Sequence, residues 1–330
     1  MDSGLIYANA RIKSLEGNLL STDKMLRMID AVSLDEAIKV LTESNYGGGV
    51  VLENSNKFES LLTSENISVT AFIREIMPKD LGMEIFFLKL DYHNAKALMK
   101  AKYLGQENAS YMLTSEGLIS IDKLSNDIIS DNYKDLYPDL KNALESIDLT
   151  FVNGDRNPRI IDIDIDKAFF KHAEKIVAKG SMSIKKYFVA LVDLTNISSF
   201  IRCRRAGLNI KSFTSGYVTG GELLEYLFTA LYDQSDEVVN EKFKYTTYKS
   251  LVNKAIENKG KALVEFETAV DNYYLNIFKN DKHDMFSVAP MAGYYLAKIT
   301  EIKVARMILV CIKNGVDKIL IKQRLRELYA

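Results

Sequence analysis

The sequence predicts an all-α protein, and three observations lead to this fold class. Only four prolines and no tryptophan occur in 330 residues, a low count of helix breakers that favours long helices over turn-rich sandwiches and barrels. Apolar residues recur with helical spacing from Leu263 to Ile277. One helical segment occurs three times along the chain. The apolar content of 47% is enough for a sizeable core.

The repeated segment is clearest from Asp91 to Gly105 and from Asp193 to Gly207. Both copies begin with Asp, carry Asn three positions later and end in Gly. The segment from Glu301 to Gly315 fits the same frame, although Val304 stands at the Asn position. Each copy follows an aromatic or apolar run, so the pattern predicts one recurrent helix. We expect three similar helical units, residues 1–107, 108–211 and 212–330, packed as one rigid body.

Local signals predict where several helices begin. Ser33 and Thr219 each stand three residues before Glu, a pattern typical of the first turn of a helix, and Ser120 opens a weaker version of it. The alternation of Ile and Asp from Ile161 to Asp166 predicts an extended segment leading into a helix, with Asp166 near the N-cap.

The polar positions of the repeated helix have two interpretations. In the second copy Asp193, Asn196, Arg204 and Gly207 share one face. An early acid and a late cation suit the helix dipole, and a terminal Gly suits a left-handed C′ residue. Alternatively, three equivalent helices converge on a pseudo-threefold axis, and their polar faces line a hole that accepts another chain.

Charge and cysteine content exclude several classes of protein. The 43 basic and 44 acidic residues give a formal net charge of −1, so we expect neither nucleic acid nor an anionic membrane surface as a partner. The two cysteines have no second Cys or His at ligand spacing, which argues against structural zinc and a disulfide framework. Without a secretory signal or an apolar run of about 20 residues, we expect a cytosolic chain that meets a membrane only through a partner.

Catalytic and metal-binding motifs are absent from the sequence. Asp162, Asp164 and Asp166 have the spacing of a calcium loop, but Lys167 stands where that loop needs Gly. The glycines at positions 47–49 lack the residues of a phosphate-binding loop, and the three histidines lie far apart with no nucleophile nearby. We therefore expect no enzyme activity, no cofactor and no metal ion.

A resemblance to a known family rests on three stretches. The C-terminal stretch from Gly293 to Leu309, followed by Lys313 to Gly315 and Arg324 to Arg326, closely resembles the signature of the C subunit of bacterial and archaeal V/A-type rotary ATPases, whose eukaryotic counterpart is called the d subunit. The sequence Tyr-Ala-Asn-Ala-Arg ending at Arg11 also agrees. In the middle, Asp193 to Ile197 and Arg202 agree, so the resemblance spans the chain.

The resemblance implies a funnel of three similar helical units that performs no catalysis. Such a funnel sits on the membrane rotor ring, at the cytoplasmic face of the membrane, and its cavity receives the central shaft made by the D and F subunits. It couples torque between ATP hydrolysis and ion movement. Whether the ion is sodium or hydrogen stays open, because that choice belongs to other subunits.

The candidate partner-binding residues are mainly basic groups near the C-terminal ends of equivalent helices. We expect them to gather at one mouth of the funnel and to meet carboxylates or helix ends of the shaft or ring. In the third copy Lys303, Val304 and Ala305 replace residues usual in the family, and Ile299 replaces a common acid. These changes leave one acid and one arginine as candidates there. The full set is Lys100, Lys102, Arg202, Arg204, Arg205, Glu301 and Arg306.

Two alternatives stay open. The first is a cytosolic helical-repeat scaffold that docks unrelated proteins. The second is a metal-dependent hydrolase that uses the carboxylates from Asp162 to Asp166.

Overall fold

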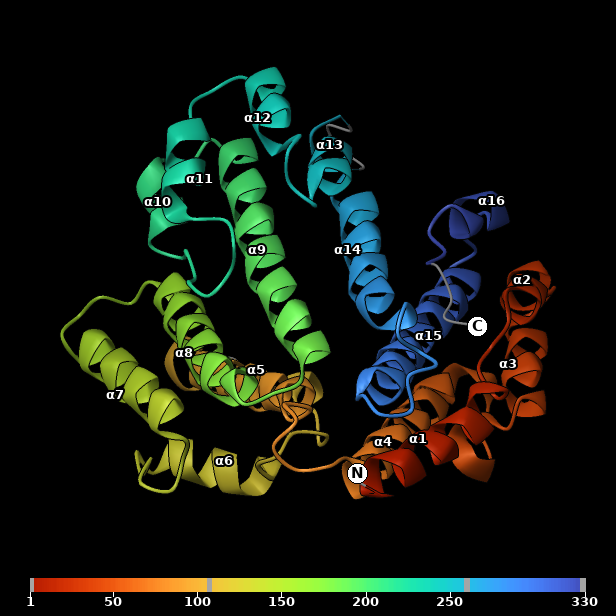
Figure 1. Ribbon diagram of the computed structural model, residues 1–330. Helices are drawn as coiled ribbons and strands as arrows, with labels where there is room; N and C mark the ends of the chain where they lie inside the picture. The colour runs from red at the N-terminus through yellow and green to blue at the C-terminus, as the bar shows by residue number, and fades with distance from the viewer. Residues whose placement is uncertain (1–2, 106–108, 258–261, 327–330) are drawn as a thin grey trace. The chain divides into compact units, whose positions relative to one another are not determined.

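The computed structural model describes residues 3–105, 109–257 and 262–326, and over these ranges the chain forms helices and no strand (Figure 1). The all-α prediction is therefore confirmed. The helices form two compact units. Unit 1 combines Met1–Pro78 with Asp236–Ala330, and unit 2 is Lys79–Ser235. The division into three sequence repeats remains a prediction.

Unit 1 brings the two ends of the chain into one helical body. In Figure 1 its N-terminal helices are red to orange and its C-terminal helices run from teal to blue. Its helices are α1 (Ser3–Glu16), α2 (Thr22–Asp30), α3 (Leu34–Glu43), η1 (Tyr46–Gly49), η2 (Ser55–Lys57), α4 (Phe58–Ile76), α12 (Asp236–Phe243), α13 (Lys249–Glu257), α14 (Ala262–Lys279), α15 (Ala289–Lys313) and α16 (Lys318–Lys322).

The core of unit 1 forms where α15 packs against N-terminal helices. Met28, Leu41 and Leu61 from the N-terminal helices lie in one buried cluster with Ile308 and Leu309 of α15. Because burial of a Leu or Ile side chain contributes about 1.5 to 3 kcal/mol, this shared core holds the chain ends together. The predicted helix between Leu263 and Ile277 is confirmed as α14, which also packs on α15.

Unit 2 is built on the two other copies of the repeated helix. One copy is α5 (Ile85–Leu104), which packs against α8 and α6, and the other is α9 (Met182–Arg205), which packs against α8 and α10. The remaining helices of the unit are η3 (Ala109–Met112), α6 (Ile121–Ile129), α7 (Pro138–Val152), α8 (Pro158–Ala178), α10 (Ile210–Thr214) and α11 (Glu225–Leu231).

The helix starts expected at Ser33 and Ser120 are confirmed, and the one expected at Thr219 is wrong. Ser33 and Ser120 cap α3 and α6 by accepting the amides of Glu36 and Lys123. Thr219 opens no helix; α11 begins only at Glu225, because the amide of Glu222 bonds to the buried carboxylate of Asp193.

The expected extended segment from Ile161 to Asp166 is instead helical. It lies inside α8, where Asn157 caps the helix by accepting the amide of Arg159 and Pro158 occupies the first turn. Proline is favoured there because the amide that it lacks would have no partner in the helix. The helix therefore begins eight residues before Asp166.

The terminal glycines of the repeat have the predicted left-handed conformation. Gly105, Gly207 and Gly315 have φ angles of 65°, 62° and 65°. Each directly or closely follows the last turn of its helix, where a residue without Cβ adopts this conformation at little cost. The three copies therefore end in the same way.

Candidate functional site

The polar residues of the repeated helix form hydrogen bonds to backbone groups of another segment of the same unit. We call this arrangement the clasp; it uses the acid of the repeat and, where present, the amide side chain. In α5 both Asp91 and Asn94 are fully buried. The Asn94 side chain donates to the Thr114 carbonyl at 2.8 Å and accepts the Thr114 amide at 2.9 Å. The Ile119 amide donates to Asp91 at 2.9 Å.

The second clasp, on α9, repeats this pattern. The Asn196 side chain donates to the Val218 carbonyl at 2.8 Å and accepts the Val218 amide at 3.0 Å. The amides of Glu222 and Leu223 donate to Asp193 at 3.2 and 3.0 Å. Since a carboxylate readily accepts two backbone amides, these bonds explain why the loop ahead of α11 stays non-helical.

The third clasp, on α15, is only half present. Glu301 is 2% exposed and accepts the Leu20 amide, 281 positions away in the sequence. Val304 occupies the Asn position and is fully buried, and its side chain has no hydrogen-bonding group. Lys298 supplies a positive charge next to the buried Glu301, because its Nζ lies 2.7 Å from both Glu301 and Glu65.

The three clasps hold equivalent points of the chain. Each acid binds the amide of the residue that directly precedes the N-cap of a helix. These residues are Ile119, Leu223 and Leu20, and the N-caps are Ser120, Leu224 and Ser21 respectively. The acid and amide of the polar face therefore bind the protein's own loops. This outcome contradicts the hypothesis that those residues line an opening for another chain.

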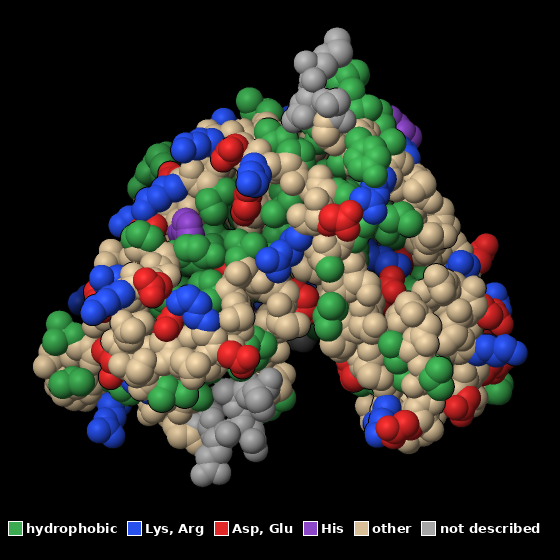
Figure 2. All heavy atoms as spheres, turned by 90° about the horizontal axis from the view of Figure 1, so that it is seen from below, with side chains coloured by type: hydrophobic (Ala, Val, Ile, Leu, Met, Phe, Trp, Pro, Cys, Tyr) green, Lys and Arg blue, Asp and Glu red, His purple; other side chains and the backbone are tan. Residues whose placement is uncertain are grey.

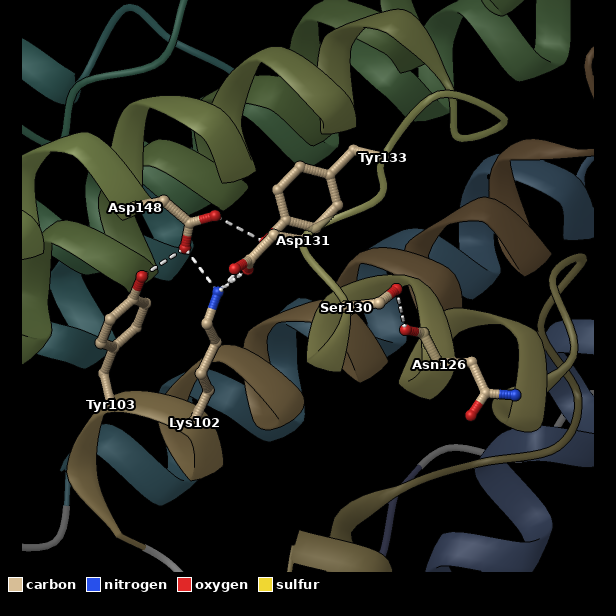
Figure 3. Close-up of polar contacts among 7 residues, drawn as sticks. All are labelled: Lys102, Tyr103, Asn126, Ser130, Asp131, Tyr133 and Asp148. Carbon is tan, nitrogen blue, oxygen red and sulfur yellow. Dashed lines mark hydrogen bonds and ion pairs between the residues drawn. The ribbon is translucent and has the colours of Figure 1, made fainter.

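Among the candidate partner-binding residues, Lys100 and Lys102 lie beside carboxylates of unit 2. The Lys100 Nζ is 2.7 Å from Asp162. The Lys102 Nζ contacts Asp131 and lies 2.8 Å from Asp148, and Figure 3 shows both carboxylates turned toward it. The carboxylates from Asp162 to Asp166 thus serve partly as ion-pair partners for α5, since Lys96 also lies 2.6 Å from Asp166.

Two tyrosines complete the cluster around Lys102. Tyr133 donates to Asp148 at 2.6 Å, and Tyr103 donates to the same carboxylate (Figure 3). Burial by itself lowers the pKa of Lys102, but hydrogen bonds from its ammonium to Asp131 and Asp148 outweigh burial and raise it. Burial, reinforced by the bond to Asp148, raises the pKa of Tyr103 to about 12. The ammonium therefore stays charged and ties the end of α5 to α7.

The arginines near the end of α9 have different neighbours. Arg204 donates to the Gln234 carbonyl, and its guanidinium lies 5.3 Å from the centre of the Phe200 ring. Arg202 and Arg205 are exposed. The helices α5 and α9 meet at their N-terminal ends, where the rings of Phe86 and Tyr187 are 5.0 Å apart, and they run in different directions from there (Figure 1).

The last two candidates differ in exposure. Glu301 is enclosed in the third clasp, whereas Arg306 is partly exposed and its Nε lies 2.9 Å from Glu59. Sequence reasoning missed Lys298 as the ion-pair partner of Glu301, and Glu65 as the second carboxylate that pairs with Lys298. The spacing of Lys298 three residues before Glu301 on a helix was the available signal for one of them.

The described part of the chain meets the requirements of neither a metal site nor a membrane span. Over residues 3–105, 109–257 and 262–326, no three His, Cys, Asp or Glu side chains are grouped so that they could hold a metal ion. Within the same ranges, no helix combines the length and apolar composition needed to cross a bilayer. On the face drawn in Figure 2, basic and acidic side chains are interspersed.

Comparison with known proteins agrees with the sequence resemblance. The model of the ATP synthase (C/AC39) subunit family matches residues 8–324. The C subunit of the V-type sodium ATPase of Enterococcus hirae is 23% identical over 97% of this chain and 98% of its own length. The C subunit of the A-type ATP synthase of Methanocaldococcus jannaschii is 25% identical over 90% of this chain and 80% of its own length. The chain therefore belongs to the ATP synthase (C/AC39) subunit family, with relatives that are C subunits of V-type and A-type ATPases.

Proposed function

We propose that this chain is a non-catalytic rotor subunit of a V/A-type ion-translocating ATPase. It acts as a socket that couples a central shaft of the D and F subunits to the membrane rotor ring. It lies at the cytoplasmic face of the membrane and meets the bilayer only through the ring. The observation that carries this proposal is the family match along residues 8–324, together with near full-length similarity to the C subunit of the Enterococcus hirae sodium ATPase.

The clasps support the repeat architecture that this function requires. Three helices, α5, α9 and α15, use an acid to hold the residue ahead of a helix N-cap. We propose that each marks one of three similar units arranged as a funnel with pseudo-threefold symmetry. The third unit is then completed by the N-terminal segment, because the loop held by α15 contains Leu20.

The candidate partner-binding residues differ in their surroundings. Glu301 is buried in the third clasp, so we propose an internal role for it. Lys100, Lys102 and Arg306 already pair with carboxylates of the same unit. We propose that Arg202 and Arg205, which are exposed at the end of α9, contact the shaft or ring together with the neighbouring Arg204.

Reconstitution tests the function. A V-type ATPase stripped of its own C subunit should recover ATP-driven ion transport on addition of this chain with its matching D and F subunits. The chain alone should hydrolyse no ATP. Stable binding to unrelated cytosolic proteins, with none of the ATPase subunits retained from detergent-solubilised membranes, would instead favour the alternative of a cytosolic scaffold.

The arginine contacts need a separate measurement. Replacing Arg202 and Arg205 by Ala should slow association with the D and F subunits and weaken its salt dependence, because charges at the rim of an interface mainly affect association rate. The melting temperature should change little, since both side chains are exposed. Lys185→Ala and Lys186→Ala on the same helix provide a charge-matched control. If the double variant associates normally with the D and F subunits but has a lower melting temperature, the arginines stabilise the fold and do not contact the shaft.

A further inference from the structure

The first clasp has a feature that the second lacks: its acid is linked to a histidine through a tyrosine that contacts both. Tyr137 donates a hydrogen bond to Asp91 at 3.3 Å, and its ring lies 4.7 Å from the ring of His172. The Nδ1 of His172 is 3.1 Å from the hydroxyl of Tyr92, a residue only 2% exposed. Asp91, Tyr137, His172 and Tyr92 thus form one connected group joining α5, the start of α7 and α8.

We infer that His172 is a pH-sensitive element that keeps the first clasp closed while its imidazole is neutral and loosens it when the ring is protonated. This inference concerns unit 2 alone and does not depend on the proposed function. The second clasp, built from the same acid, amide and loop bonds, provides an internal reference in the same unit.

The hydrogen bond to Tyr92 gives the neutral ring its advantage. A neutral imidazole can accept the hydroxyl proton at Nδ1, whereas an imidazolium has only donors. Protonation therefore deprives a buried hydroxyl of its acceptor, and an unsatisfied buried donor is unfavourable. Either the Tyr92 hydroxyl turns its proton away and accepts from the ring, or the ring of His172 moves. Tyr137, which packs against the ring, carries that displacement to Asp91.

The charges around His172 come from every element packed on it. Asp139 at the start of α7 attracts a proton to the ring, but this buried carboxylate already lies 2.5 Å from Lys175 and 3.5 Å from Lys171. The ring also faces a cavity of about 300 Å³ that contains charges of both signs. Its charged lining groups are Asp80 and Glu84 from the segment before α5, Asp139 from α7, and Lys175 and Lys179 from α8.

The balance of these effects favours the neutral ring. Burial is the largest influence and lowers the pKa of His172; Asp139 opposes it and Lys175 adds to it. In the unfolded chain the ring titrates near its ordinary value of about 6.5. Near this pH the unfolded chain binds more protons than the folded one, so stability falls as the pH decreases below about 6.5 and stops falling once the folded ring is protonated.

The protein contains three histidines, which makes a direct test feasible. In an NMR titration of the full chain, the His172 ring should titrate below the ordinary imidazole pKa of about 6.5. A His172 ring that titrates at or above this value would overturn the inference. This measurement uses the unaltered protein and requires no variant to fold.

Hydrogen exchange then links the titration to the clasp. After correction for the intrinsic effect of pH, protection of the Ile119 amide should fall between pH 7.5 and pH 5.5, while protection of the Leu223 amide in the second clasp should not. His172→Gln should remove this difference, because Gln can still bond to Tyr92 but does not titrate. His283→Gln is the matched control and should leave it intact. Equal pH dependence of the two amides in the unaltered chain would contradict a histidine-controlled clasp.

Discussion

The clasps of α5 and α15 use the same acid-to-amide contact over different lengths of chain. Asp91 holds Ile119 across 28 positions, whereas Glu301 holds Leu20 across 281. For a flexible loop, a tenfold increase in length raises the entropic cost of closure by about 2 kcal/mol. The third clasp therefore needs support from the hydrophobic core that α15 shares with the N-terminal helices.

The polar parts of the two clasps differ accordingly. The first has an amide side chain, Asn94, that makes two bonds to its loop, and the third has Val304 instead. In place of those neutral bonds, the third has Lys298 between Glu65 and Glu301, all three largely buried. Both closures use a carboxylate that accepts a backbone amide. The local one adds neutral hydrogen bonds of Asn94, and the one between distant segments adds a buried cation and apolar burial.

The largest expected effect comes from ending the chain after residue 290. This truncation removes nearly all of α15, including Ile308 and Leu309 of the shared core. Unit 1 should lose cooperative unfolding, because the N-terminal helices then expose their apolar faces. Hydrogen exchange with mass spectrometry should show loss of protection in residues 3–78 and retained protection around Ile119 and Leu223. Persistent protection of residues 3–78 would show that the N-terminal helices fold without α15.

Removing the positive charge of Lys298, which pairs with Glu65 and Glu301 in the third clasp, should have the next largest effect on stability. Lys298→Met leaves two buried carboxylates close together without their cation, and loss of one partner of a buried ion pair costs about 3 to 5 kcal/mol. Urea unfolding of unit 1 measures this change. Lys303→Met on the same helix is the control and should cost less than about 1 kcal/mol, because Lys303 is half exposed. Similar losses for both variants would mean that the buried cluster contributes no more than a surface pair.

Adding a methyl group beside the clasp acids should disturb the two local clasps by similar amounts. A Cβ at Gly117 would lie 2.3 Å from the Asp91 Oδ1, and one at Gly221 would lie 2.1 Å from the Asp193 Oδ1. Gly117→Ala and Gly221→Ala should each destabilise unit 2 by about 1 to 3 kcal/mol by displacing a carboxylate from its buried amides. Thermal unfolding measures the loss. Gly17→Ala, which meets open space, is the control.

The smallest expected effect concerns the helix ends, where all three copies are alike. Gly105, Gly207 and Gly315 have positive φ angles and open space where a Cβ would lie. Replacing each by Ala should cost about 1 kcal/mol, because only backbone strain is added. Denaturant midpoints compare the three variants. If one variant loses several times more unfolding free energy than the other two, the three helix ends are not energetically equivalent despite their equal φ angles.

Regular local patterns were enough to predict much of the fold. The spacing of apolar residues predicted α14, and the repeated frame predicted α5, α9 and α15. The serine caps of α3 and α6 and the left-handed terminal glycines also followed from sequence, because each depends on neighbours within a few positions.

The same local rules failed where distant groups compete for the backbone. Thr219 has the sequence of a helix cap, but Asp193 takes the amide of Glu222 and the loop remains non-helical. Of the candidate site, sequence could place Lys102 near a helix end, but its bonds to Asp131 and Asp148 depend on how α6 and α7 fold back on α5.

The sequence by itself determined the helical class, the three copies of one helix and the family resemblance, since these reside in periodicity and short motifs. Only the tertiary structure decided what the repeated acid does and which loop closes each copy. The choice of Leu20 as the partner of Glu301 has no local signal, because it arises when the two ends of the chain bury one apolar core and bring a buried carboxylate to an amide 281 positions away.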